Sequence, residues 1–191
     1  MKYDLSKTPT RAAQRTLDAF RGEMFRLLAE KPFEDVSARE LCEGANYPRA
    51  TFYNYFDDKY DLLNYCWIWL AQQIRFDEYR HMPRNEMLYV FFDRIFDYAT
   101  ANAEAIRRIL ARNSEEGYLF SSFRTFMDQR VRETFRSCPD AQAAPVPAAL
   151  LADHYSQTLL LVWRWSMAAG QGCQKAEARG YLRYLIGDGR D

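Results

Sequence analysis

The chain contains few of the residues on which catalysis and metal binding usually depend. It has two histidines and four cysteines among its 191 residues, and no two cysteines form a C-x-x-C pair. With so few histidines and no paired cysteines, the sequence has no set of zinc ligands. It also has no glycine-rich loop, and no group of residues suggests a catalytic centre. We therefore expect a protein that is not an enzyme and that has no metal and no cofactor. We expect its cysteines to be free thiols, with a redox switch between two of them as the alternative: Cys42, Cys66, Cys138 and Cys173.

Long apolar segments are also absent. No stretch of about 18 apolar residues is free of charge, so the sequence predicts no membrane span. The opening residues, MKYDLSKTPT, do not have the apolar region of a secretory signal. These absences predict a cytoplasmic protein with no membrane partner.

The formal net charge is zero, whereas DNA-binding domains are usually basic. The local distribution matters more than the sum. Between residues 2 and 26 there are six basic residues and three acidic ones. Residues 2–26 therefore carry a local excess of basic side chains.

Helical periodicity extends through the chain, and no β-strand pattern occurs. We predict an all-α fold of about nine helices. Two short helices lie within residues 37–56, and the others cover approximately 10–30, 58–80, 85–100, 103–112, 117–137, 147–169 and 174–186.

The segment SARELCEGANYPRATFYNYFDDK, residues 37–59, carries the strongest local signals. Ser37 followed by Glu40 predicts a capping box at the start of a helix. Gly44, Ala45 and Asn46 predict a turn, because Gly and Asn tolerate positive φ. A proline is well tolerated at the start of the helix that follows. This layout predicts a helix-turn-helix motif at about residues 37–56, whose second helix enters the DNA major groove.

The second helix of this motif has distinct inner and outer faces. Phe52 and Phe56 are four residues apart and can pack on Leu41 and on the preceding helix. The outward residues offer guanidinium, amide, hydroxyl and phenol groups, which hydrogen-bond to phosphates and base edges. These residues are Arg49, Tyr53 and Asn54, with Thr51 and Tyr55 on the flanks.

The motif resembles the DNA-binding domain of the TetR/AcrR family of bacterial transcriptional regulators. The resemblance is carried by the run Thr51-Phe52-Tyr53-Asn54-Tyr55-Phe56, by Asp58-Lys59 and by Leu62-Leu63, and it extends over roughly residues 10–65. It implies a helix-turn-helix DNA-binding domain at residues 1–57 and a helical regulatory and dimerisation domain at residues 58–191. Four positions depart from the family pattern: Asn46 lies in a turn that usually has Gly, Pro48 replaces a usual Ser, Ala50 a frequent Gly or Ser, and Tyr60 a usual Glu.

The resemblance and the outward face together suggest which residues bind DNA. Tyr53 is the strongest candidate for a phosphate contact. Lys59 would add a flanking phosphate contact, and Arg11 is a weaker candidate. The full set of predicted DNA-binding residues is Ser37, Arg49, Thr51, Tyr53, Asn54, Tyr55 and Lys59.

The predicted helix at about 147–169 is apolar over much of its circumference, which indicates more than one partner surface, and the last helix has an apolar face of its own. Two such helices from each of two chains can form a four-helix bundle with two-fold symmetry. The alternative is a monomer that buries both faces internally. The predicted interface residues are Leu151, Tyr155, Thr158, Leu159, Val162, Trp165, Tyr181, Leu182 and Leu185.

The resemblance implies a repressor that binds a near-palindromic DNA operator as a homodimer and is released by a small-molecule effector. The many rings favour an apolar or aromatic effector, although rings at helical spacing more often belong to a core. The alternative function is an α-helical protein-interaction module without sequence-specific DNA binding. Candidate effector-binding residues are Trp69, Phe92, Phe96, Phe123 and Phe126.

Overall fold

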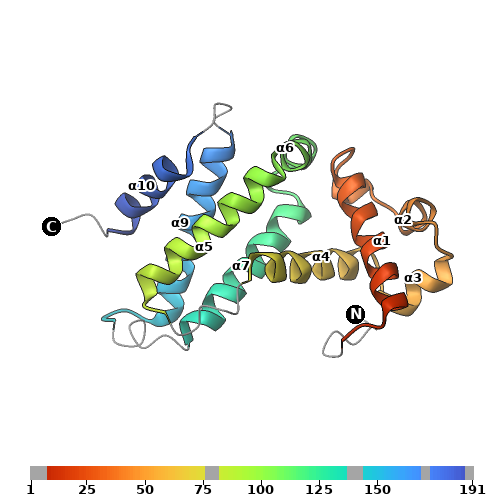
Figure 1. Ribbon diagram of the computed structural model, residues 1–191, viewed down its shortest axis with the longest axis horizontal. Coiled ribbons are helices and arrows are strands. Elements are labelled where there is room, and N and C mark those ends of the chain that lie inside the picture. Colours follow the sequence, from red (N-terminus) through yellow and green to blue (C-terminus); the bar gives the residue numbers. More distant parts are fainter. Residues whose placement is uncertain (1–7, 76–81, 137–143, 169–172, 188–191) are drawn as a thin grey trace. The chain divides into compact units, whose positions relative to one another are not determined.

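The structure is a computed structural model that describes residues 8–75, 82–136, 144–168 and 173–187. Within these ranges the chain forms nine α-helices and one 3₁₀-helix and no β-strand, which confirms the all-α prediction (Figure 1). The elements in chain order are α1 (Arg11–Leu28), η1 (Phe33–Asp35), α2 (Ala38–Ala45), α3 (Arg49–Tyr55), α4 (Lys59–Ile74), α5 (Arg84–Ala101), α6 (Ala103–Arg112), α7 (Tyr118–Arg136), α9 (Ala148–Ala168) and α10 (Lys175–Ile186).

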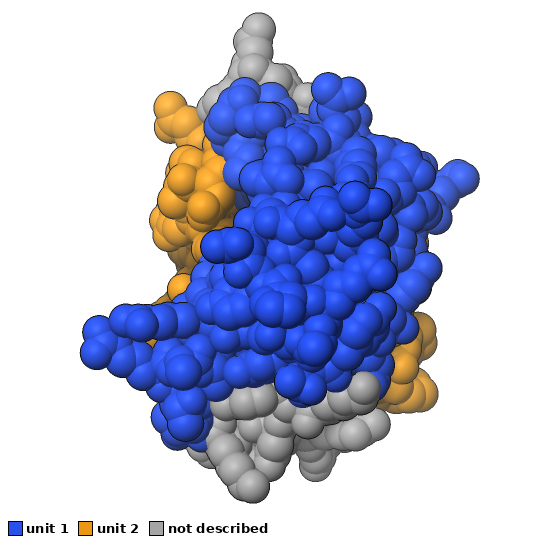
Figure 2. Space-filling view, turned by 90° about the vertical axis from the view of Figure 1, so that its right-hand side faces the viewer, with its two compact units in different colours: residues 1–70, 104–123 blue, residues 71–103, 124–191 orange. Residues whose placement is uncertain are grey.

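The chain divides into two compact units, coloured separately in Figure 2. Unit 1 consists of residues 1–70 and 104–123, and unit 2 of residues 71–103 and 124–191. Unit 1 therefore contains the predicted DNA-binding region together with residues 104–123, which follow it in the sequence only after residues 71–103 of unit 2. The predicted boundary between residues 57 and 58 stays a prediction about where one function ends and the other begins.

The core of unit 1 forms around Phe20 of α1. Its ring lies 5.3 Å from that of Phe52 and 6.0 Å from that of Phe56, and all three side chains are fully buried. Leu41 of α2 is also fully buried. The inward face predicted for the helix-turn-helix is therefore confirmed, and burial of these apolar side chains fixes α3 against α1.

The turn between α2 and α3 differs from the prediction at Gly44 and Ala45. Both residues belong to α2, and the left-handed conformation falls on Asn46 alone, with φ 56°. The absence of a side chain at Gly44 has another cause. A Cβ there would lie 1.9 Å from Oε1 of Glu23, so glycine leaves room on α2 for the Glu23 carboxylate of α1.

Unit 2 contains α5, α9 and α10, which pack on one another (Figure 1). Phe91, Phe92 and Leu182 are among its buried side chains. Two ion pairs attach α10 to α5, with Lys175 Nζ 2.8 Å from Asp97 and Arg179 Nη1 2.8 Å from Asp93. Within the described ranges, no helix is both long and apolar enough to cross a membrane.

The cysteines that the structure describes are unpaired, as predicted: Cys42, Cys66 and Cys173. Cys138 lies outside the described residues. Burial raises the pKa of the Cys42 and Cys66 thiols, which keeps both protonated at neutral pH. Among the described residues, no group of three His, Cys, Asp or Glu side chains is arranged to hold a metal ion.

Candidate nucleic-acid interface

The N-terminus of α2 is closed by the predicted capping box. Ser37 Oγ accepts a hydrogen bond from the Glu40 N–H at 3.3 Å, and the Glu40 carboxylate accepts one from the Ser37 N–H at 3.1 Å. The Ser37 hydroxyl also donates to Glu40 Oε2 at 2.7 Å. Two of the unpaired N–H groups of the helix end are thereby satisfied. The DNA contact predicted for Ser37 would have to share this hydroxyl with Glu40.

The predicted outer face of α3 is accessible. Arg49, Tyr53 and Asn54 are exposed, and the Tyr53 side chain is 44% exposed although its ring meets that of Phe52 edge-on at 5.3 Å. Thr51 and Tyr55 are half-buried, as expected of flanking positions. The structure thus brings these residues together on one short helix whose opposite side is anchored in the core.

An open hollow of about 520 Å³ lies beside this face, between α2 and α3. It includes Arg39, which the sequence analysis did not single out. The Arg39 guanidinium pairs with Glu43 at 2.6 Å, which raises its pKa. No pattern in the sequence distinguishes this arginine from an ordinary solvated helix residue. The hollow is lined by Arg39, Cys42, Glu43, Asn46, Tyr47, Pro48 and Arg49.

Lys59, at the first position of α4, makes internal contacts that the sequence analysis did not predict. Its ammonium donates to the carbonyl oxygens of Phe33 at 3.0 Å, Glu34 at 2.7 Å and Val36 at 2.8 Å. Partial burial lowers its pKa. The ammonium therefore closes the end of η1, and the phosphate contact predicted for it would compete with these carbonyl groups.

Residues 25–66, which extend from α1 into α4, match the family model described as bacterial regulatory proteins, tetR family. The match includes the capping box, the αL turn and the aromatic face described above. This part of the chain is therefore similar to the DNA-binding domain of TetR-family regulators. The fold of the chain is that of a DNA-binding transcription regulator. No curated protein sequence matches the chain.

Several solved structures share the fold of this chain. A proposed tetR family transcription regulator from Shewanella sp. PV-4 has a TM-score of 0.65 and 16% identity over 91% of this chain and 97% of that one. The fatty acid degradation regulator FadR from Bacillus halodurans has a TM-score of 0.58 and 15% identity over 96% and 99%. The transcriptional regulator FadR from Bacillus subtilis, in complex with stearoyl-CoA, has a TM-score of 0.55 and 15% identity over 91% and 97%. At these identities the likeness shows the fold alone.

The predicted dimer residues fall into two groups. Tyr155, Thr158, Leu159, Val162 and Leu182 are buried within their own chain. Leu151 and Tyr181 are half-buried, whereas Trp165 and Leu185 are exposed. Trp165 is 55% exposed, and its ring meets that of Tyr181 edge-on at 5.3 Å. Apolar side chains that the prediction omitted are also exposed in α9 and α10: Leu150, Leu161 and Tyr184.

The predicted effector residues are divided between the two units. Trp69, in unit 1, packs on α1, with the Arg21 guanidinium 4.0 Å from its ring centroid and the ring of Phe25 at 6.2 Å. Phe123, also in unit 1, contacts Trp67 at 5.1 Å. In unit 2, Phe92 and Phe96 are buried with ring centroids 5.9 Å apart, and Phe126 is half-buried.

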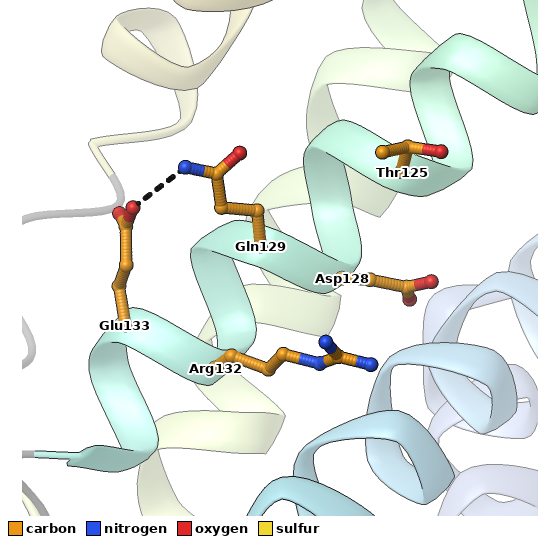
Figure 3. Close-up of a pocket in the computed structure, with 5 residues that line it drawn as sticks. All are labelled: Thr125, Asp128, Gln129, Arg132 and Glu133. Carbon is orange, nitrogen blue, oxygen red and sulfur yellow. Dashed lines mark hydrogen bonds between the residues drawn. The ribbon is translucent and has the colours of Figure 1, made fainter.

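A second hollow, of about 440 Å³, lies on α7 in unit 2. Asp128 and Arg132 point toward α9 (Figure 3), where Arg132 binds Asp153 at 2.7 Å and Asp128 accepts from Gln157 at 3.2 Å. The hollow is also lined by Thr125, Gln129 and Glu133, and Gln129 donates a hydrogen bond to Glu133 at 3.0 Å (Figure 3). The partners of Asp128 are neutral side chains, those of Ser156 and Gln157, whereas Arg132 is paired with Asp153. None of the predicted effector residues lines this hollow.

Proposed function

We propose that this protein is a TetR-family transcriptional repressor that binds a near-palindromic operator as a homodimer. The observation that carries the proposal is the outer face of α3, where Arg49, Tyr53 and Asn54 stand exposed while Phe52 anchors the helix from behind. A guanidinium, a phenol and an amide on one exposed helix match the donors and acceptors of phosphates and base edges. We assign DNA reading to residues 1–57 and regulation with dimerisation to residues 58–191.

The need for a second copy follows from the small size of the reading helix. Helix α3 has seven residues, so one copy contacts only a few base pairs. Two copies related by a two-fold axis read half-sites about 34–36 Å apart, one helical turn of DNA. The exposed Leu161 and Trp165 of α9 and Tyr184 of α10 support a partner surface in unit 2, because large apolar side chains gather there outside the core.

We further propose that a small apolar or aromatic molecule releases the repressor from its operator. Unit 2 has an interior rich in rings, among them Phe91, Phe92 and Phe96. The Bacillus subtilis regulator of the same fold was solved in complex with stearoyl-CoA, a ligand with a long apolar chain. An effector of this kind must bind the DNA-free form better than the DNA-bound form, because only that difference shifts the equilibrium.

The test is selection of genomic DNA fragments by the purified protein at about 150 mM salt, a condition that weakens purely electrostatic binding. Sequencing of the retained fragments should give a near-palindrome with half-sites about one turn apart. The recovered duplex is then titrated with stearoyl-CoA, with free stearate and with coenzyme A alone. Release by stearoyl-CoA or stearate but not by coenzyme A supports an apolar effector. Retention of no DNA, or of random DNA only, contradicts the proposed function.

A further inference from the structure

Asn113, directly after α6, is a buried polar residue that unites distant parts of unit 1. It is 6% exposed. Its Oδ1 accepts a hydrogen bond from the Phe33 N–H at 2.9 Å, and its Nδ2 donates to the carbonyl oxygens of Leu28 at 3.0 Å and Ile109 at 2.9 Å. Leu28 ends α1 and Phe33 begins η1. One side chain thus satisfies backbone groups at both ends of the connection between them, and a buried group that loses such partners carries the full desolvation penalty.

The start of α7 makes a second attachment to the same segment. The Tyr118 N–H donates to Glu34 Oε1 at 2.9 Å, and this bond is the main reason that the pKa of Glu34 lies below its usual value. Gly117 leaves room for the carboxylate, since a Cβ there would lie 3.3 Å from Glu34 Oε1 and 3.0 Å from the Ser114 carbonyl oxygen.

Three rings complete this attachment. The Tyr118 ring stacks on Phe33 with centroids 5.4 Å apart and meets the Tyr60 ring edge-on at 4.7 Å. Phe33 and Tyr60 are themselves 5.3 Å apart. Such offset and edge-on pairs are favourable arrangements of aromatic side chains. Tyr60, which departs from the family pattern, therefore contributes a ring to the junction.

Helix η1 leads directly into the helix-turn-helix. Val36 follows it, and Ser37 caps α2. On one side η1 is held by Asn113 and Tyr118, and Lys59 closes its end with three hydrogen bonds. The position at which α2 begins, and with it the position of α3, is therefore set partly by residues about 80 positions further along the chain.

We propose that Asn113 and Tyr118 are positioning residues for DNA binding, which hold η1 so that α2 and α3 present the reading face correctly. We call residues 113–118 the α6–α7 corner. Neither residue touches DNA in this proposal, which rests on the proposed function. When the corner is detached, only a fraction of molecules is competent to bind, and the apparent affinity falls by that fraction.

The test compares operator affinity with folding in four proteins: the parent, Asn113→Ala, Tyr118→Ala and Tyr118→Phe. Tyr118 is partly exposed, so its variants should fold even if Asn113→Ala does not. Tyr118→Phe retains the ring and serves as the matched control. If detachment leaves about one molecule in ten competent, Asn113→Ala and Tyr118→Ala bind the selected duplex about tenfold more weakly, and Tyr118→Phe stays within about twofold of the parent.

Each affinity is measured well below the melting temperature of that variant, with helical content checked by circular dichroism. A purely structural role would lower the melting temperature without changing the affinity of the folded protein. Native-state hydrogen exchange gives a readout that needs no DNA, because the Phe33 N–H should lose protection in Asn113→Ala more than amides of α10 do.

The outcomes separate this inference from the proposed function. If the parent binds its selected duplex and the folded Tyr118→Ala and Asn113→Ala proteins bind it equally well, the positioning role is overturned and the proposed function stands. If the parent selects no duplex, both are overturned. Unchanged protection of the Phe33 N–H in Asn113→Ala would overturn the attachment itself.

Discussion

Gly44 of α2 lies so close to Glu23 of α1 that a Cβ would stand 1.9 Å from the Glu23 Oε1 atom. The Glu23 carboxylate is held in place by Arg26, whose Nε and Nη2 atoms donate to it at 2.8 and 2.6 Å. The side chain of Glu23 is nearly buried. The observed position of the Glu23 carboxylate therefore depends on the missing side chain at Gly44, in the first helix of the DNA-binding motif.

We predict that Gly44→Ala lowers the free energy of unfolding by about 1 kcal/mol, because the Glu23 carboxylate must leave Arg26. Gly22→Ala on α1 is the matched control, since a Cβ there meets nothing within 4 Å. This control should stabilise the protein by about 0.5–1 kcal/mol through helix propensity. Both are measured by urea unfolding.

The effect of Gly44→Ala can also be measured in a protein that already carries Glu23→Ala. In a Glu23→Ala protein the obstructing carboxylate is absent, so adding Gly44→Ala should no longer destabilise and should raise stability as at Gly22. The change of sign between the two backgrounds is a coupling that a double-mutant cycle measures directly. Equal effects of Gly44→Ala in both backgrounds would show that the contact with Glu23 does not control this position.

The pH dependence of the α2 cap is a second prediction. Hydrogen bonds from the Lys31 ammonium and from Ser37 lower the pKa of Glu40 from 4.5 to about 2. Because the unfolded chain binds this proton more readily, the contribution of Glu40 is complete above about pH 4.5 and is lost as the pH falls toward about 2. Glu40→Gln should therefore lower stability by about 0.5 kcal/mol at pH 7, a small effect because the pair is partly exposed.

The measurement is urea unfolding of the parent and Glu40→Gln between pH 7 and the lowest pH at which the parent remains folded. The difference between them should shrink continuously below about pH 4.5. Glu116→Gln, at an exposed carboxylate outside this cluster, controls for the change in net charge. A difference that stays constant down to the acid limit would contradict the role of the ionised carboxylate.

Local sequence signals correctly predicted much of the helix-turn-helix at residues 37–56. The Ser37–Glu40 capping box, the inward Phe52 and Phe56 and the outward Arg49 all follow from spacing of three or four residues. Contacts between distant segments have no such signal. The bond between Asn113 and the Phe33 N–H spans 80 positions, and the same asparagine could have been a solvated residue at a helix end.

The dimer face shows a different limit of sequence analysis. Periodicity identified α9 as apolar, but the helix has apolar residues on more than one side, and the pattern does not say which side faces the chain's own core. Val162 and Leu159 lie in the core of their own chain, whereas Leu161 and Trp165 are exposed. The choice between the faces is made by packing against α5 and α10, which is tertiary information.

The internal bonds of Lys59 give a third prediction. Lys59→Ala removes three charge-assisted bonds to carbonyl groups, so it should lower the free energy of unfolding by about 1–2 kcal/mol as well as weaken DNA binding. Arg49→Ala removes an exposed side chain and should change stability by less than about 0.5 kcal/mol.

DNA binding distinguishes these two residues further. If Arg49 contacts a phosphate, Arg49→Ala should reduce the slope of log affinity against log salt by about one. The measurement is fluorescence anisotropy of a labelled operator duplex across a salt series, beside urea unfolding of each protein. A Lys59→Ala protein as stable as the parent would mean that its carbonyl bonds make no net contribution in solution.

The fourth prediction concerns the exposed apolar side chains of α9. Leu161 is 49% exposed and lies one helical turn from Trp165. Leu161→Arg should place an unpaired charge in the proposed dimer interface and weaken dimerisation at least about tenfold. Ala105→Arg, an exposed position on α6, adds the same charge away from that surface and should have no effect.

Sedimentation equilibrium of the parent and both variants measures the oligomeric state, and circular dichroism confirms that each is folded. We expect a dimer for the parent and for Ala105→Arg, and a largely monomeric Leu161→Arg protein with reduced operator affinity. A dimer that persists in Leu161→Arg would place the partner surface elsewhere on the chain.

The central claim is that the outer face of α3 reads DNA sequence. The most direct measurement is parallel selection of genomic fragments at about 150 mM salt by the parent and by the double variant Arg49→Ala/Asn54→Ala. Both substitutions fall on exposed residues, so the core of the motif is unchanged. The account predicts one near-palindrome from the parent and only weakly bound, sequence-random DNA from the variant. Recovery of the same palindrome by both proteins would show that another part of the chain reads the sequence.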